Sequence, residues 1–504
     1  MEEEIELADF SSDNESIDNL CESDDEDVDC TISKKITVSA HKDVVDDSCS
    51  DTSDEDDAPG IQVSRSTEIW RKSSKSRSDA PFTNDFGPNV PSNVKSPLDI
   101  FLCLFPDDLI DTILLETNVY LEQNRYKQPS ATKEGLLIFL GINILMGVKK
   151  CPSYRDYWSA NPQLNDSYIS SLMTVNHFAF FLGSLHLADN SKEPKKGETN
   201  YDKLYKVRPL LDKLRKTFKN CWKPSQYQSV DESMIKFKGR SSMKQYMPAK
   251  PVKRGYKCWV RADETGYTCE FQVFTGKTES TEKQLGARVV RDLTRVLVDN
   301  NHHVYFDNFF TGVELMMSLK NDNIFACGTV RQNRVRLPKS DIPDKKMHHG
   351  QSDFRTSNTG IRWIKWMDKK AVYFLSNYHD PSEVETVQRK QKDGSLKTIN
   401  CPIMVSDYNK HMEKGLNPIL SSKEFKLRLV DQLVGHKLQT TKGRKPQAAK
   451  VSNYKPQVSI EKGDQNQLTY PRILLLQSVV LIAVQKMISD EHHGFVKYAM
   501  SHSA

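Results

Sequence analysis

The stretch that decides the fold is residues 228–240, Gln-Ser-Val-Asp-Glu-Ser-Met-Ile-Lys-Phe-Lys-Gly-Arg. Here acidic residues in a strand-like run are followed by basic residues. The acidic pair is Asp231 and Glu232. From Lys236 to Arg261 the chain has nine Lys or Arg residues and no Asp or Glu. Charges of one sign repel along a loop, so a polyanion such as nucleic acid would stabilise it. The stretch predicts a metal-binding acid beside phosphate-binding bases.

A second acid follows an apolar run at residues 303–310, where Asp307 comes directly after His-Val-Tyr-Phe. Two short β-prone runs, 256–260 and 269–274, separate it from Asp231. This order of strands fits a ribonuclease-H-like core, in which the first and fourth strands lie side by side. Asp231 and Asp307 are therefore expected to meet, although 76 positions separate them in the sequence.

Two helices are expected in this region from capping boxes. Thr281 with Gln284 precedes apolar residues at helical spacing, and Thr311 with Glu314 opens a second helix after Asp307. Upstream, Ser96 followed by Pro97 predicts a capped helix start.

The ordered series of motifs resembles the piggyBac transposase family over roughly residues 97–435. The motifs are Val-Asp-Glu-Ser-Met at 230–234, Phe-Lys-Gly-Arg at 237–240, Tyr-Met-Pro-Ala-Lys-Pro-Val-Lys-Arg-Gly-Tyr-Lys at 246–257, Phe-Asp-Asn-Phe-Phe-Thr at 306–311, Cys-Gly-Thr-Val-Arg at 327–331 and Asp-Tyr-Asn-Lys-His-Met at 407–412. The resemblance implies a DDE transposase core of α/β class. It also implies cutting and joining of DNA at terminal repeats with Mg²⁺ or Mn²⁺.

The resemblance also implies a site of three aspartates, of which Asp231 matches the first and Asp307 the second. Both are expected to be catalytic and to bind metal, with Glu232 pointing away and Asn308 orienting Asp307. The third acid should follow Met412 in a Gly-Gly-Val-Asp motif, but the chain reads Glu-Lys-Gly-Leu at 413–416. The helix that follows this motif and the cysteine-rich zinc module are not found either, so no zinc is expected. Nearby acids at 407, 413 and 431 do not align with the motif.

The basic stretch supplies the expected contacts to DNA phosphates. These are Lys236, Lys238, Arg240, Lys244, Lys250, Lys253, Arg254 and Lys257. Phe237, Tyr246 and Tyr256 lie among them and fit either base stacking or core packing. His302 and His303 are expected in the core or in solvent rather than as ligands.

Charge and composition divide the chain into parts. Residues 1–60 carry 22 Asp or Glu and 3 Lys or Arg, a net charge of −19, whereas the rest is basic. The expected parts are an acidic disordered leader (1–96), a helical dimerisation and DNA-binding region (97–220), the ribonuclease-H-like core (221–334), an insertion domain (335–400), an incomplete remainder of the core (401–436) and a basic, largely disordered tail (437–504). Trp363 and Trp366 in the insertion fit core packing better than base stacking.

The expected function is that of a piggyBac-like, transposable-element-derived protein that binds double-stranded DNA in the nucleus, with catalysis impaired by the missing acid. A homodimer is a further expectation from the resemblance. No membrane partner is expected, because the longest apolar run, 473–484, is too short to span a bilayer. Two alternatives stay open: a non-catalytic nuclear DNA-binding protein derived from a transposase, and an inert relic or incompletely assembled gene product.

Overall fold

The computed structural model describes residues 68–74, 80–94, 96–126, 130–237, 241–248, 250–276, 284–390, 394–414 and 423–435. The expectations for residues 1–67, for the tail from 436 onward and for Lys238 and Arg240 lie outside these ranges. Within them, no helix is both long enough and apolar enough to cross a membrane.

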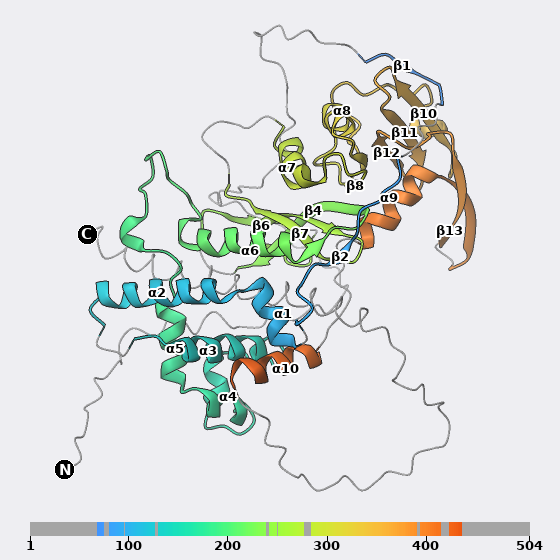
Figure 1. The fold of residues 1–504 in the computed structure, drawn as a ribbon. Coiled ribbons are helices and arrows are strands. Elements are labelled where there is room, and N and C mark those ends of the chain that lie inside the picture. The colour runs from blue at the N-terminus through green and yellow to red at the C-terminus, as the bar shows by residue number, and fades with distance from the viewer. Residues whose placement is uncertain are drawn as a thin grey trace, which may run out of the picture.

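A large mixed sheet organises the described part of the chain (Figure 1). Its core strands are β4 (Tyr227–Lys236), β6 (Arg254–Asp263), β7 (Thr268–Val273), β8 (His303–Phe306) and β9 (Phe325–Thr329). β6 is antiparallel to its neighbours β4 and β7, β8 runs parallel to β4, and β9 runs parallel to β8. The predicted adjacency of the first and fourth strands is confirmed. The short edge strand β5 (Lys244–Tyr246) pairs with β6.

Helices cover both faces of this sheet. α7 (Leu285–Thr294) and α8 (Val313–Asn321) share a core with one face of β4, β8 and β9, including Val289, Met316 and Val304. α9 (Ile403–Lys414) packs on the opposite face, where Met404 and Val405 meet Tyr305 and Cys327. The sheet is therefore a buried layer between helices, and the four residues of β8 are all buried for that reason.

One predicted capping box is wrong. The N-cap of α8 is Gly312, and the Thr311 hydroxyl donates instead to the carbonyl of Asp307 at 2.9 Å. The box at Thr281 lies outside the described residues, and Gln284 begins α7 in the left-handed conformation with φ of 59°. Helix α8 forms without the expected cap because its apolar face is buried against the sheet.

The region 97–220 is helical, as its composition predicts. Its α-helices are α1 (Pro97–Leu104), α2 (Asp107–Gln123), α3 (Lys133–Met146), α4 (Ser167–Leu172), α5 (Val175–Ser184) and α6 (Arg208–Asn220). Ser96 caps α1 in a full capping box with Asp99, and Pro97 occupies the first turn. α10 (Lys423–Leu433) returns from the far end of the chain to pack on α3 and α1, sharing their apolar core through Leu429 and Val430.

The segment 335–400 extends the core sheet by three strands and adds a separate two-stranded sheet. β10 (Ser352–Ser357), β11 (Arg362–Met367) and β12 (Ala371–Ser376) continue from β9 as antiparallel neighbours. The hairpin of β13 (Val384–Lys390) and β14 (Leu396–Pro402) stands beside them. Trp363 and Trp366 are both 2% exposed, so base stacking is ruled out for them and core packing is confirmed.

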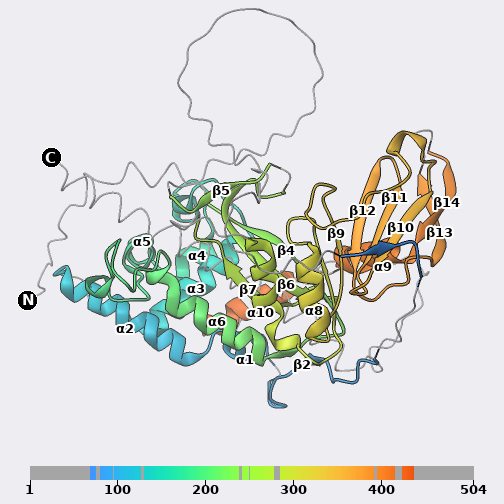
Figure 2. The same ribbon diagram turned by 90° about the horizontal axis from the view of Figure 1, so that it is seen from above.

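Part of the acidic leader is ordered, which corrects the expectation of disorder through residue 96. β1 (Trp70–Arg71) pairs with β10, and β2 (Gly87–Pro88) pairs with β3 (Trp222–Lys223). In Figure 2 this segment runs from the β10 side of the molecule towards the helical region. Composition alone does not predict this order, because β1 and β2 pair with strands that lie more than 100 residues away in the sequence.

Candidate functional site

The parallel register of β4 and β8 brings the two predicted acids together. Val230 on β4 is the register partner of Phe306 on β8, and Asp231 and Asp307 each follow directly. Asp231 and Asp307 therefore occupy corresponding positions on two neighbouring parallel strands. The structure places the two expected ligands side by side.

Each carboxylate of the pair at 231–232 has its own lysine. Lys250 Nζ lies 2.7 Å from Asp231 Oδ2, and Lys257 Nζ lies 3.0 Å from Glu232 Oε1. Both acids are largely buried, with side chains 13% and 10% exposed. Adjacent residues of a strand face opposite sides, and on this ground Glu232 is still expected to point away from the site. Two of the lysines expected at DNA phosphates therefore neutralise carboxylates instead.

Asp307 is held by donors from its own loop and from β9. The Thr329 hydroxyl donates to Oδ1 at 2.9 Å, and the backbone amide of Asn308 donates to the same oxygen. The side chain of Asn308 accepts from Arg331 Nε at 3.1 Å. Asn308 thus contacts Asp307 through its backbone, while its side chain ties the loop to Arg331.

Tyr408 is a member of the site that the sequence did not identify. It lies on α9, its ring meets Phe374 edge-on, and its hydroxyl bonds with Thr329. Burial raises the pKa of Tyr408 well above its usual value, and the charges of Asp307 and Asp231 add to this. The phenol therefore stays protonated beside the two carboxylates. Its position directly after Asp407 in the Asp-Tyr-Asn-Lys-His-Met motif was the only signal for it in the sequence.

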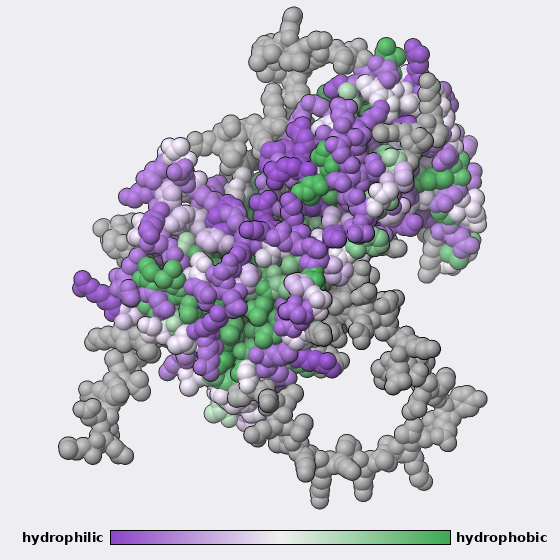
Figure 3. All heavy atoms as spheres, in the orientation of Figure 1, coloured by the Kyte–Doolittle hydropathy of each residue, from purple (hydrophilic) through white to green (hydrophobic). Residues whose placement is uncertain are grey.

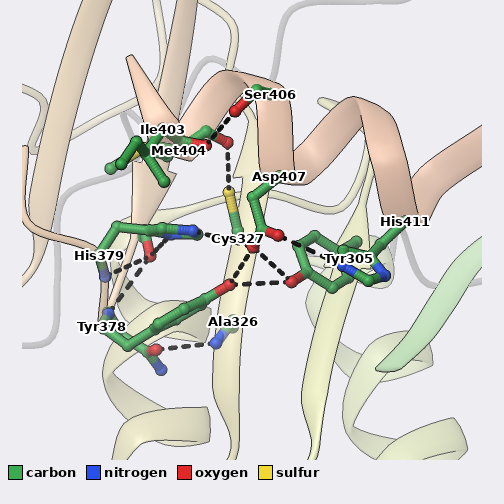
Figure 4. A network of polar contacts seen from close by, with 12 residues as sticks. Tyr305, Ala326, Cys327, Tyr378, His379, Ile403, Met404, Ser406, Asp407 and His411 are labelled. Carbon is green, nitrogen blue, oxygen red and sulfur yellow. Dashed lines mark hydrogen bonds and ion pairs between the residues drawn. The ribbon is translucent and has the colours of Figure 1, made fainter. Parts of the chain in front are cut away.

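Asp407 itself points into a buried polar network under α9 (Figure 4). Its Oδ2 accepts from the hydroxyls of Tyr305 at 2.7 Å and Tyr378 at 2.9 Å and lies 3.0 Å from His379 Nε2. His411 Nε2 lies 3.3 Å from the other oxygen. Burial alone would raise the pKa of this carboxyl, but hydrogen bonds from His379, His411 and Tyr305 hold it well below its usual range.

This network fixes the rotation of α9 on the sheet. Tyr305 belongs to β8, Tyr378 and His379 follow β12, and His411 lies one helical turn after Asp407. A charged acceptor with several donors is among the stronger polar contacts available to a buried group. Asp407 anchors the helix, and Tyr408 is aimed at the acid pair as a result.

No third acid joins Asp231 and Asp307 in the part of the chain that the structure describes. Over the described ranges, no group of three or more His, Cys, Asp or Glu side chains could hold a metal ion. Asp431 accepts a hydrogen bond from Tyr168 at 2.9 Å in the helical region, and the side chain of Glu413 lies outside the description. Two carboxylates and water oxygens suit a single divalent cation, whereas a metal pair needs further anionic ligands.

The basic stretch divides into an exposed set and a buried set. Lys236, Lys253 and Arg254 are exposed, and Lys244 is half-buried. Arg261 is 1% exposed and donates to Gln228 and to the carbonyl of Leu293, both at 2.6 Å. The exposed set lies near the edge strand β5, at the end of β4, which carries Asp231, and at the start of β6.

The interleaved aromatic residues divide in the same way. Phe237 and Tyr256 stack on each other in the core with ring centres 4.8 Å apart, so packing is confirmed for them. Tyr246 is 59% exposed, and the guanidinium of Arg254 lies 4.9 Å from its ring centre. His302 and His303 are buried, which is one of the two placements predicted for them.

Comparisons with known proteins agree with this geometry. A family model described as Transposase IS4 matches residues 96–417. The human "PiggyBac transposable element-derived protein 3" is 30% identical over 329 residues, which cover 63% of this chain and 54% of the relative. The human "PiggyBac transposable element-derived protein 2" is 29% identical over 332 residues, covering 64% and 55%. The chain spans about half the length of these curated relatives.

A solved structure shows the same fold. The cryo-EM structure of a piggyBac transposase synaptic complex with hairpin DNA aligns with a TM-score of 0.56 and 22% sequence identity. The alignment covers 82% of this chain and 79% of that chain.

Proposed function

Because this chain belongs to the piggyBac transposase family, we propose that it is a transposon-derived protein that binds double-stranded DNA along its ribonuclease-H-like core. One observation carries the proposal: the parallel register of β4 and β8 sets two carboxylates side by side, and exposed Lys236, Lys253 and Arg254 lie at the end of β4 and at the start of its other neighbour, β6. Cations on a surface attract phosphates without reading sequence. The solved relative is a complex with hairpin DNA, which supports the same class of partner.

Asp231 and Asp307 are the residues that would hold Mg²⁺ or Mn²⁺. A divalent cation there would activate an attacking oxygen or stabilise a leaving one. Tyr408 and Thr329 would hold Asp307 in place, and the ammonium of Lys250 would have to leave Asp231. With two carboxylates at the site among the described residues, we infer DNA binding with impaired strand transfer. An active transposase is the alternative.

Two further expectations belong to the proposal. The helical region supports a homodimer, because the larger apolar patches of the face in Figure 3 gather over it and Leu115 of α2 is 62% exposed. A nuclear location follows from DNA as the partner.

The test is DNA affinity of the full chain as a function of salt. Fluorescence anisotropy with a duplex that carries the element's ends should show affinity falling steeply with salt. Replacing Lys253 and Arg254 together by Gln should lower the slope of log affinity against log salt by about 1.8, since each phosphate contact contributes about 0.9. Lys369→Gln with Lys370→Gln is the matched control, because these exposed lysines lie at the far turn of β11 and β12. A slope near zero in the unchanged protein would sink the proposal.

The same duplex separates the two functions. Asp231→Ala with Asp307→Ala should leave binding in place. Cleavage with Mg²⁺ or Mn²⁺ that disappears in this double variant would establish the active enzyme instead.

A further inference from the structure

A short N-terminal strap, residues 68–74, is seated on the outer edge of the sheet. β1 pairs with β10 in the register Trp70↔Ser357 and Arg71↔Thr356. Asn358 brackets the strand: its amide donates to the carbonyl of Ile69 at 2.9 Å, and its side chain accepts from the Ile69 amide at 3.0 Å. An edge strand otherwise offers unpaired backbone groups, so the strap covers the edge of β10.

Side chains add to this backbone pairing. The indole of Trp70 donates to the carbonyl of Arg336 at 3.0 Å, and the hydroxyl of Thr356 donates to the carbonyl of Ser73 at 2.6 Å. The described chain beyond the strap then lies against the core, where Phe82 meets His302 with ring centres 4.9 Å apart. The strap is therefore one end of a segment that connects the sheet edge to the core.

The last residue of the strap is fastened to an acid. Ser74 Oγ lies 2.7 Å from both carboxylate oxygens of Asp380 and 3.0 Å from Ser382 Oγ. Ser382 also donates to Asp380 through its amide and its hydroxyl. Ser74 is exposed, and so are Arg71 and Lys72, three and two positions before it. A hydroxyl at the surface is thus preceded by two cations and held by a carboxylate and the hydroxyl of a neighbouring serine.

We propose that Ser74 is a phosphorylation site for a serine kinase that recognises arginine three residues before its acceptor, and that phosphorylation detaches the strap. The kinase supplies ATP as the co-reactant. Ser74 Oγ forms a bond to the γ-phosphorus, the bond from that phosphorus to the oxygen of ADP breaks, and the hydroxyl proton passes to the carboxylate base of the kinase.

Phosphorylated Ser74 would not keep its contacts with Asp380. Phosphorylation removes the donor that Asp380 accepts from and adds about −1.5 to −2 charges next to it. Two cations near the seat in the described part of the chain are already engaged. Lys72 lies 3.8 Å from Asp353, and Arg362, whose charge acts on Asp380, is 4% exposed and donates to the carbonyl of Asn377 at 2.5 Å. Repulsion between the phosphate and Asp380 therefore outweighs what these cations offset and favours release.

The test uses the full chain, a purified kinase of this specificity and ATP. Mass spectrometry should locate the phosphate on Ser74, and Ser74→Ala should abolish it. Ser73→Ala is the matched control and should leave it in place. Hydrogen exchange at the amides of Ile69 and Asn358 should then accelerate by about tenfold or more, as expected for like charges in contact at a protein surface.

A second variant tests whether repulsion by Asp380 is what releases the strap. Asp380→Asn removes the repelling charge, so exchange at Ile69 should accelerate much less after phosphorylation of this variant. Ser74→Asp should reproduce the acceleration without a kinase. Phosphate found only on other serines, or phosphorylation of Ser74 with exchange unchanged, would overturn the proposal.

Discussion

At the scale of single residues, Lys250 determines whether Asp231 is free to bind a metal ion. Its ammonium lies where a cation would contact Asp231, at 2.7 Å, and the side chains of Lys250 and Asp231 are 27% and 13% exposed. An ion pair of this kind competes with metal, because either cation satisfies the same oxygen. The lysine thus stabilises the metal-free core and opposes metal binding.

Lys250→Gln is expected to strengthen binding of Mn²⁺ by about tenfold, because a unit charge in contact with a carboxylate changes its cation affinity by one or more powers of ten. Titration calorimetry with Mn²⁺ measures this directly. Lys257→Gln is the matched control: it frees Glu232, which is expected on the opposite side of the strand from Asp231, and should leave the affinity unchanged. Equal affinity in the Lys250 variant and the unchanged protein would show that Lys250 does not guard the site.

At the scale of elements, helix α7 depends on close contact with the loop after β8. A Cβ on Gly286 would lie 2.7 Å from the carbonyl oxygen of Phe309 and 3.0 Å from Cα of Phe310. Backbone atoms cannot give way as a side chain does. The glycine therefore lets α7 approach the segment that begins at Asp307, and so helps to hold the second acid.

Gly286→Ala is expected to lower the free energy of unfolding by about 1–3 kcal/mol, the usual cost of forcing extra volume into a packed contact. Gly183→Ala is the control, because a Cβ at this helical glycine in α5 would meet no atom within 4 Å. That control should gain about 0.5–1 kcal/mol, since alanine favours helix. Urea unfolding followed by circular dichroism measures both, and a neutral Gly286 variant would contradict the contact argument.

For the whole molecule, buried histidines make stability depend on pH. Burial lowers the pKa of His302 and of His303 to about 4. A hydrogen bond with the carbonyl of Ser225 opposes this for His302, and the charge of Asp407 opposes it for His303. The unfolded chain binds protons at these imidazoles below about pH 6.5, whereas the folded chain binds them only near pH 4. Stability is therefore lost as pH falls through this window.

Between pH 7 and pH 5 the free energy of unfolding should fall by on the order of 1–2 kcal/mol for each of these histidines. Urea midpoints at the two pH values measure the change. His302→Gln should flatten the dependence, and the exposed His177→Gln should not. The depressed pKa of Asp407 acts at lower pH, because its contribution is present above about pH 4 and disappears only as acid protonates the carboxylate. A midpoint independent of pH would contradict the burial argument.

The sequence determined the order of the core strands, the helical region, the capped start of α1 and the two acids that meet at β4 and β8. These features follow from local signals, namely apolar periodicity, β-propensity and a capping box, or from motifs that lie in one stretch of chain. The wrong cap at Thr311 shows the limit of such signals, because burial of the α8 face formed the helix without it.

Only the tertiary structure decided which group each charge meets. Lys250 and Lys257 were predicted as DNA contacts, yet they pair with Asp231 and Glu232 across the fold. Asp407 bonds with Tyr305, 102 positions away, and Ser74 bonds with Asp380, 306 positions away. Local patterns carry no information on such pairs, because the free energy of an ion pair or hydrogen bond depends on the burial and distance that folding sets.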